Sequence, residues 1–262
     1  MITIGSLFSG IGGLELGLEW AGLGPVLWQV ECNPTARAVL AQHWPETTRH
    51  DDVHAVGRAT LAPVGLICGG FPCQDVSAAG LRVGLQGARS GLWFEYSRIV
   101  SELRPRWVVV ENVTSGAHLW VDAVRAGLER LGYATLPVPL AAADVGASHL
   151  RERIFIVATD THRDGKPART KHAKVASPSS ATSHPSCPRR ERHNSSGAQS
   201  KESELTMHPG WSSEPDLVRV VHGVSARVDG RRARIAALGN SVVPQCAEVV
   251  GWVIRELAGV AS

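Results

Sequence analysis

Residues 1–13 read Met1-Ile2-Thr3-Ile4-Gly5-Ser6-Leu7-Phe8-Ser9-Gly10-Ile11-Gly12-Gly13. The first seven are mainly apolar, with Thr and Ser between them, which predicts a short strand. Residues 14–20 mix leucines with Glu15 and Glu19 and predict a helix that ends near Gly22 and Gly24. A strand, a glycine-rich turn and a helix in this order open a nucleotide-type βαβ unit. We therefore expect an α/β, doubly wound fold.

The glycine turn allows two interpretations. Glycines let a backbone approach a ligand, and the N-terminus of the following helix offers free N–H groups to it. Alternatively, the glycines only let the helix pack closely on the strand. The dinucleotide pattern G-x-G-x-x-G fails because Glu15 stands where its third glycine is needed. A nicotinamide or flavin cofactor is therefore disfavoured.

Acidic residues follow the next two expected strands. The strand 26–30 ends at Glu31, about 20 residues after the glycine turn, where an acid suits the hydroxyls of a ribose. The alternative for Glu31 is a cap at the start of the helix predicted at 36–44. Asp51 and Asp52 follow a third short segment. An acid there suits an adenine amino group, and a helix cap is again the alternative.

A cysteine follows a further expected strand, residues 64–68, which runs into Gly69-Gly70-Phe71-Pro72-Cys73-Gln74. Pro72 fixes its own φ and keeps Phe71 out of the helical region, so the turn is stiff. It presents Cys73 at the carboxyl end of a strand, where ligands bind in open α/β sheets. A thiolate is a strong nucleophile, which suits covalent catalysis. The alternative is a structural cysteine in a tight turn.

Charged residues accompany two later strands. The β-branched run 107–110 predicts a buried parallel strand that ends at Glu111-Asn112-Val113. A carboxylate there is costly unless it is hydrogen-bonded or functional, so we expect Glu111 on the same rim as Cys73. Arg151 and Arg153, at i and i+2 before the strand 154–158, are expected to face one side and to bind a phosphate or a carbonyl. A solvated edge is the alternative.

The remaining segments complete the expected fold. Helical spacing recurs at 90–102 and 121–131, and residues 133–142 are extended. Residues 74–89, rich in Gly, Ala and Ser, predict a mobile loop or lid. Residues 238–244 predict a turn, and Pro244 suits the start of a last helix that ends at Leu257.

The composition is that of a soluble enzyme, with 44% hydrophobic and 19% charged residues and a net charge of +3. Five cysteines without CxxC or zinc spacing indicate free thiols, no metal site and a reducing compartment. We find no signal peptide or membrane span and expect a cytoplasmic protein. Residues 160–213, rich in Ser, Pro, His, Lys and Arg, predict a loop or disorder. A nucleic-acid contact surface and a solvated linker are the two interpretations of this segment.

The chain resembles the DNA cytosine-5 methyltransferases in the order and spacing of its short motifs. The combination of a Pro-Cys-Gln turn, a Glu-Asn-Val strand end and a late Gly-Asn-Ser turn is specific for that family. The resemblance covers residues 1–160 and 215–258. The matching stretches are Phe8–Gly13, Glu31, Asp52, Gly70–Gln74, Glu111–Val113, Arg151–Arg153 and Gly239–Pro244.

The resemblance implies a Rossmann-like fold that uses S-adenosylmethionine. Residues 1–160, completed by 236–262, would form the catalytic domain. Residues 161–235 would form a short, basic, poorly ordered target-recognition insert, with duplex DNA in the cleft between. Phe8 would stack on the adenine, Glu31 would hold the ribose and Asp52 the adenine amino group. The cofactor-binding residues so implied are Phe8, Gly10, Gly12, Gly13, Glu31, Asp52, Val53, Pro72, Asn240 and Ser241.

The implied reaction is methylation of C5 of a cytosine flipped out of duplex DNA, through a bond between Cys73 and C6. Glu111 would offset charge in the ring, Arg153 would bond the base carbonyl O2, and Arg151 would orient this rim. The protein is expected to be monomeric. Two alternatives stay open: a transfer-RNA cytosine-5 methyltransferase and a DNA-binding homologue without catalysis. Whether the protein serves restriction–modification or phage self-protection depends on neighbouring genes.

Overall fold

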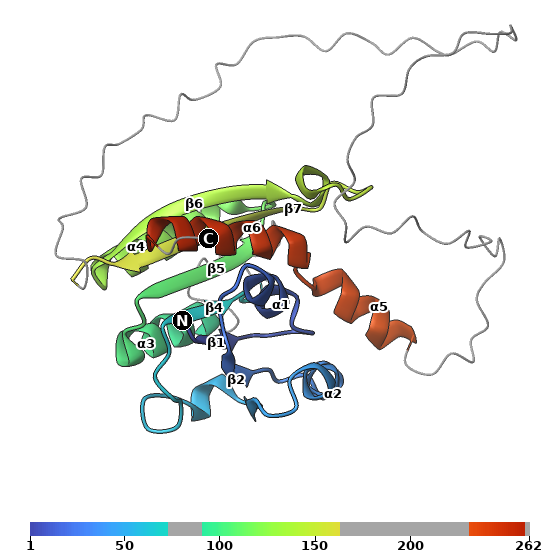
Figure 1. Ribbon diagram of the computed structural model, residues 1–262, viewed down its shortest axis with the longest axis horizontal. Helices are drawn as coiled ribbons and strands as arrows, with labels where there is room; N and C mark the ends of the chain where they lie inside the picture. The colour runs from blue at the N-terminus through green and yellow to red at the C-terminus, as the bar shows by residue number, and fades with distance from the viewer. Residues whose placement is uncertain (73–90, 163–230, 260–262) are drawn as a thin grey trace, which may run out of the picture.

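The computed structural model describes residues 1–72, 91–162 and 231–259. These residues form a seven-stranded sheet with helices on both faces, and the strand order is β3-β2-β1-β4-β5-β7-β6 (Figure 1). Three sequence-based expectations fall outside the described residues. They concern Cys73, the loop at 74–89 and the basic segment up to residue 230.

Most elements lie where the sequence predicts them, although the first strand begins at Ile4 and not at Met1. The strands are β1 (Ile4–Leu7), β2 (Val26–Val30), β3 (Thr48–His50), β4 (Leu66–Gly69), β5 (Trp107–Val113), β6 (Tyr133–Ala141) and β7 (Glu152–Asp160). The helices are α1 (Gly13–Trp20), α2 (Pro34–His43), α3 (Gly91–Leu103), α4 (Ala117–Arg130), α5 (Arg231–Asn240) and α6 (Pro244–Leu257), with short 3₁₀ turns η1 (Val53–Ala55) and η3 (Ala142–Val145).

The sheet reverses direction at β7. Strands β3, β2, β1, β4 and β5 are parallel, whereas β7 runs antiparallel to β5 and β6. Pairing of β5 with β4 stops at Val110, but pairing with β7 continues through Glu111 to Val113. The strand expected at 107–110, ending at Glu111-Asn112-Val113, is present, and pairing with β7 extends it through these three residues. The register sets Arg153 opposite Val113 and so diagonal to Glu111.

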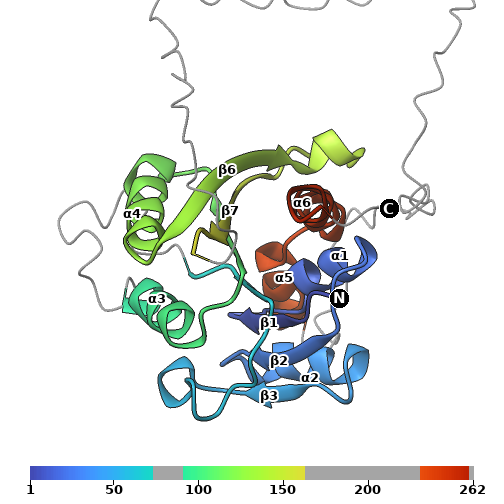
Figure 2. The ribbon, with the colours of Figure 1, turned by 60° about the vertical axis from the view of Figure 1, so that its left-hand side comes forward.

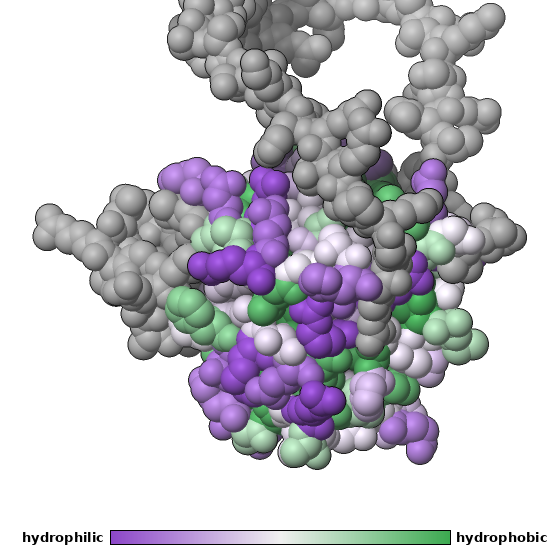
Figure 3. Space-filling view, turned by 90° about the vertical axis from the view of Figure 1, so that its left-hand side faces the viewer, coloured by the Kyte–Doolittle hydropathy of each residue, from purple (hydrophilic) through white to green (hydrophobic). Residues whose placement is uncertain are grey.

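Two apolar cores fill the spaces between sheet and helices. On one face α3 and α4 bury large aromatic residues, among them Tyr96 and Trp120. On the other face α1 and α6 bury Leu18 and Val250 (Figure 2). The outer surface near α3 and α4 intersperses hydrophilic and apolar residues (Figure 3). The doubly wound α/β fold expected from the sequence is confirmed.

The last helix, α6, packs against the first helix, α1. Arg255 Nη1 donates to the carbonyl oxygen of Ala21 at 2.9 Å, across 234 residues of chain. A Cβ at Gly17 would overlap the carbonyl oxygen of Pro244, and one at Gly251 would overlap the Cβ of Ala21. These glycines therefore let the backbones of α1 and α6 approach closely. This contact joins the parts of the chain that precede and follow the basic segment.

One expected turn is wrong in its position. Residues 238–240 belong to α5, and the chain leaves helical geometry only at Ser241. Pro244 then begins α6 at its first turn, as predicted. The expected domain boundary between residues 235 and 236 lies inside α5.

Gly17→Ala should lower the free energy of unfolding by about 1–3 kcal/mol, because the added methyl group overpacks the α1–α6 contact. Alanine has a higher helix propensity than glycine, so a loss of stability would have to come from the overpacked contact. Urea denaturation measures it. Gly91→Ala is the matched control, because a Cβ there meets nothing within 4 Å and should not destabilise. Equal stability of Gly17→Ala and wild type would contradict the close-packing account.

Candidate active site

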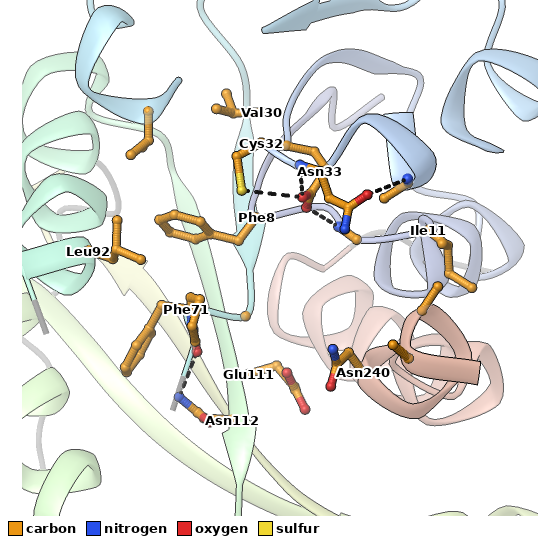
Figure 4. Close-up of a pocket in the computed structure, with 18 of the residues that line it drawn as sticks. Phe8, Ile11, Val30, Cys32, Asn33, Phe71, Leu92, Glu111, Asn112 and Asn240 are labelled. Atoms are coloured by element: carbon orange, nitrogen blue, oxygen red, sulfur yellow. Dashed lines mark hydrogen bonds between the residues drawn. The ribbon is translucent and has the colours of Figure 1, made fainter. Parts of the chain in front are cut away.

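A cavity of about 760 Å³ opens at the carboxyl ends of the parallel strands (Figure 4). The loops after β1, β2, β3 and β4 and the end of β5 form its wall, as expected for ligand sites in open α/β sheets. Part of α5 closes the remaining side. The predicted site residues among its lining are Phe8, Gly10, Glu31, Asp52, Val53, Pro72, Glu111, Arg153 and Asn240.

The turn after β1 holds three residues with left-handed backbone. Phe8 has φ 55°, Gly10 has φ 57° and Gly12, which caps α1, has φ 88°. A bulky residue with positive φ is a backbone outlier, and such outliers gather at ligand sites. The Phe8 ring stacks on Tyr96, with ring centroids 6.5 Å apart, and borders the cavity. The turn therefore presents an aromatic face and open backbone to the cavity.

Glu31 is held at the tip of β2 by two backbone donors. Gly10 N–H donates to its Oε2 at 2.7 Å and Asn33 N–H donates to its Oε1 at 2.8 Å. Asn33 caps α2, because its Oδ1 accepts from the N–H groups of Thr35 and Ala36. The capping alternative for Glu31 is therefore wrong. Glu31 lines the cavity, and its carboxylate oxygens have lone pairs beyond those that these two donors occupy.

Asp52 takes the capping role that the sequence left open, and its expected contact with an adenine stays a prediction. It caps η1, and its Oδ1 accepts from the His54 N–H and lies 2.9 Å from the His54 Nδ1. Donation from the His54 backbone and ring lowers the pKa of Asp52, so the carboxylate is ionised at neutral pH. Asp52 and its neighbour Val53 also line the cavity.

Glu111 and Arg153 form an ion pair on the opposite wall. Arg153 Nε lies 2.9 Å from Glu111 Oε1, and the two side chains are 17% and 10% exposed. Burial raises the pKa of Glu111 to about 7, against the opposing charges of Arg153 and Arg151. A Cβ at Gly70 would lie 2.5 Å from Glu111 Oε2, so any other residue there would displace the Glu111 carboxylate. The site therefore holds a carboxyl group able to donate or accept a proton near neutral pH.

Arg151 does not share the strand geometry that its spacing from Arg153 predicted. It precedes β7 and has a left-handed φ of 36°. Its guanidinium donates to the carbonyl oxygen of Gly239 at 2.7 Å and to that of Ser241. Arg151 thus ties the start of β7 to the α5–α6 junction and positions Asn240, which borders the cavity.

Asn112 fixes the turn that leads to Cys73. Its side-chain Nδ2 donates to the carbonyl oxygen of Phe71 at 3.1 Å, and its Oδ1 accepts from the Val113 N–H. The Phe71 ring packs on Trp93 and Trp120. Pro72 lines the cavity and directly precedes Cys73 in the chain. Asn112 belongs to the Glu-Asn-Val motif, but no role could be predicted for it from the sequence.

A second, smaller cavity of about 40 Å³, which we call the inner chamber, lies behind the glycine turn. It shares five lining residues with the main cavity: Phe8, Gly10, Gly70, Glu111 and Asn240. Gly13 also borders it, and a Cβ there would overlap the carbonyl oxygen of Val242. The polar residues that border the chamber are Ser6, Ser9, Glu15, Glu111, Asn240 and Ser241.

Glu15 is the residue of this site that the sequence reasoning missed. Its side chain is completely buried, and neither carboxylate oxygen meets the geometry of a hydrogen bond with any described residue. Burial raises the pKa of Glu15 to about 7, and the nearby hydroxyls of Ser6 and Ser9 offset part of the rise. An acid between Leu14 and Leu16 on a short helix was the available signal.

Within residues 1–72, 91–162 and 231–259, no group of three or more His, Cys, Asp or Glu side chains could hold a metal ion. None of the described helices combines the length and apolarity that a bilayer crossing requires.

The family model of the C-5 cytosine-specific DNA methylases matches residues 2–216. The chain is 34% identical over 162 residues to the type II methyltransferase M2.BsuMI of Bacillus subtilis, and 32% identical over 155 residues to M.HhaI of Haemophilus parahaemolyticus. These matches cover 59% and 58% of this chain but 41% and 47% of the relatives. A solved structure, a candidate DNA modification methyltransferase encoded within an Escherichia coli prophage, has 29% identity and a TM-score of 0.52 over 63% of this chain and 48% of that one. The chain thus spans less than half of each of these proteins.

Glu15→Gln should raise the free energy of unfolding at about pH 8. The folded-state pKa of about 7 lies above the ordinary 4.5, so the folded protein keeps a proton that the unfolded chain releases. Wild-type stability therefore falls as the pH rises from 4.5 through 7, by on the order of 3 kcal/mol from this group. Glutamine cannot ionise and should escape that loss.

Urea denaturation at about pH 5 and about pH 8 measures the effect. The difference in stability between Glu15→Gln and wild type should be larger at the higher pH. Glu46→Gln, at an exposed position outside the cavity, is the control for the loss of a carboxylate and should show no such widening. Equal differences at both pH values for Glu15→Gln would refute the buried-acid interpretation.

Proposed function

The chain belongs to the C-5 cytosine-specific DNA methylase family, and we propose that it transfers a methyl group from S-adenosylmethionine to C5 of a cytosine in duplex DNA. The observation that carries the proposal is the buried Glu111–Arg153 pair. It lies in the wall of a cavity large enough for a nucleoside cofactor and a base, beside the turn that leads to Cys73. The type II methyltransferases to which the chain is similar support the same reaction.

The residues that line the cavity fit S-adenosylmethionine. Glu31 would accept hydrogen bonds from the ribose hydroxyls, and Asp52 would accept one from the adenine amino group. The Phe8 ring would stack on the adenine, next to Val53. Gly10 leaves space for close approach, since a Cβ there meets nothing within 4 Å. When bound, the cofactor supplies an electrophilic sulfonium methyl group.

Cys73 would supply the nucleophile that cytosine chemistry needs. C5 of cytosine reacts poorly on its own, and a thiolate bond to C6 makes C5 enamine-like. After C5 has taken the methyl group, its proton leaves and the bond between sulfur and C6 breaks, which frees Cys73. The proton acceptor is water in this proposal. The roles of Cys73 and Pro72 rest on their place in the sequence motif.

Glu111 and Arg153 would stabilise the charge that builds in the ring. A carboxyl group with a pKa of about 7 can hold a proton at N3 of the base while the thiolate adds at C6. Arg153 would donate to the carbonyl O2 of the same base. Arg151 is a positioning residue, because its guanidinium is occupied by the carbonyl oxygens of Gly239 and Ser241.

The base must leave the duplex to reach these groups, since its ring atoms are stacked inside the helix. We propose that residues 1–160 and 236–262 form the catalytic part, and that the basic segment 161–235 contacts DNA. Phosphate contacts by its Lys and Arg residues would make binding weaken as salt rises.

Cys73→Ser should abolish methyl transfer while leaving S-adenosylhomocysteine binding measurable, because serine lacks a comparable nucleophile. The assay incubates the full chain with labelled S-adenosylmethionine and either duplex DNA or transfer RNA. The proposal expects label in duplex DNA from the wild type and none from the variant. Label found only in transfer RNA would show that transfer RNA, and not DNA, is the substrate. Methylation by Cys73→Ser would show that Cys73 is not the nucleophile.

Glu111→Gln should slow the single-turnover rate by roughly 100-fold or more, because glutamine cannot exchange a proton with the base. Affinity for duplex DNA should change far less. Rapid-quench kinetics and a binding titration give the two quantities. Glu256→Gln, on the exposed side of α6, is the matched control. A wild-type single-turnover rate for Glu111→Gln would take Glu111 out of the chemistry.

A further inference from the structure

Helix α3 supports two separate parts of the main cavity wall from behind. Tyr96, which is completely buried, stacks on the Phe8 ring with the ring centroids 6.5 Å apart. Arg98 lies two residues further along the helix and contacts a different segment, residues 53–58, which follows β3. Phe8 and the start of that segment both line the cavity. One helix therefore contacts both the aromatic wall and the wall that begins at Asp52.

Arg98 holds the start and the end of the short turn η1. Its Nη2 donates to the carbonyl oxygen of Val53 at 3.1 Å and to that of Val56 at 2.9 Å, across 45 and 42 residues of chain. Val53 is the first residue of η1, and Val56 follows its last residue. Val53 lines the cavity, and Asp52 directly precedes it as the cap of η1. The guanidinium therefore fixes the backbone that carries Asp52.

Two glutamates on the same helix orient this guanidinium. Arg98 Nε donates to Glu95 Oε2 at 2.8 Å, and its Nη1 donates to Glu102 Oε1 at 2.8 Å. Glu102 Oε2 accepts from the Arg58 N–H at 3.0 Å, so Glu102 also joins α3 to the segment after β3. Donation from the Arg98 side chain and from the Arg58 N–H lowers the pKa of Glu102, which is therefore ionised at neutral pH. The network directs the remaining Arg98 donor towards η1.

Gly57 lets this segment lie close to α3. A Cβ at Gly57 would lie 2.5 Å from Glu102 Oε2 and 3.1 Å from Arg98 Nη1. Any larger residue would displace these groups, so the absence of a side chain is part of the contact. A helix-surface ion pair alone would not need that space. The network is thus built between two elements and not only along one helix.

We propose that Arg98 is a positioning residue that makes the site selective for the 6-amino group of adenine. The inference rests on the proposed function, in which Asp52 accepts from that amino group while Phe8 stacks on the ring. A hydrogen bond to a carboxylate is directional, so Asp52 must be held at a fixed place relative to Phe8. Arg98 is not among the residues that line the cavity, and it acts through the backbone of η1.

Isothermal titration calorimetry with two ligands tests the inference without turnover. They are S-adenosylhomocysteine and its analogue with hydrogen in place of the 6-amino group. The wild type should bind S-adenosylhomocysteine roughly 10- to 100-fold more tightly, the range for a hydrogen bond to a charged group. Arg98→Met keeps an unbranched stem but has no donors, and it should reduce this ratio to within about threefold. Its affinity for the analogue should stay within about twofold of wild type, because stacking on Phe8 does not use the amino group.

Three further variants separate positioning from structural damage. The double variant Arg98→Met/Asp52→Asn should have the ratio of Asp52→Asn alone, because Arg98 acts through Asp52. Arg125→Met removes a similar ion pair from α4, outside the cavity, and should keep the wild-type ratio. Gly57→Ala should lower the ratio without removing a charge, because the added methyl group displaces Glu102 and Arg98. It tests the inference even if Arg98→Met does not fold.

The possible results distinguish this inference from the proposed function. A wild-type ratio in every folded variant of Arg98 and Gly57, or an equal weakening of both ligands, overturns the inference and leaves the proposed cofactor standing. A wild type that binds both ligands equally overturns the contact between Asp52 and adenine, and the inference with it. A wild type that binds neither ligand overturns the proposed cofactor as well.

Discussion

The ion pair between Glu111 and Arg153 is the constraint on which the site depends. A carboxylate inside a sheet is costly without a partner, and the partner comes from β7, which runs antiparallel to both β5 and β6. Because β7 reverses, Arg153 arrives diagonal to Glu111 at the edge where the parallel strands end. Burial still outweighs the attraction, so the Glu111 pKa lies near 7 and not below its ordinary value. The fold thus creates a proton-exchanging group where a base would bind.

The second constraint joins two distant parts of the chain. Glycines in α1 and α6 let the helices pack backbone to backbone. Arg151 then fastens the α5–α6 junction to the start of β7 through the carbonyl oxygens of Gly239 and Ser241. Asn240 is thereby brought against the cavity that the N-terminal residues build.

Much of the fold and site was predictable, and the failures have identifiable causes. Strand ends with an acid, such as Glu31, follow from local periodicity together with the rule for carboxyl edges. The full length of β5 could not be predicted from local sequence, because its last residues pair with β7, which is distant in the chain. The left-handed backbone of Arg151 has no local signal in a non-glycine residue. Glu15 was overlooked because an acid on a short helix usually faces solvent. The expectation for Cys73 falls outside the described residues and remains a proposal.

The central claim is that Cys73 bonds to C6 of a cytosine during turnover. Fluorine at C5 of the target cytosine blocks loss of the C5 substituent, so the bond to sulfur cannot break after methylation. Mass spectrometry of peptides from protein incubated with such a duplex and S-adenosylmethionine tests the claim directly. The account predicts a denaturant-resistant adduct on the Cys73 peptide that requires the cofactor. An adduct on Cys32, or none from protein that methylates the unmodified duplex, would contradict it.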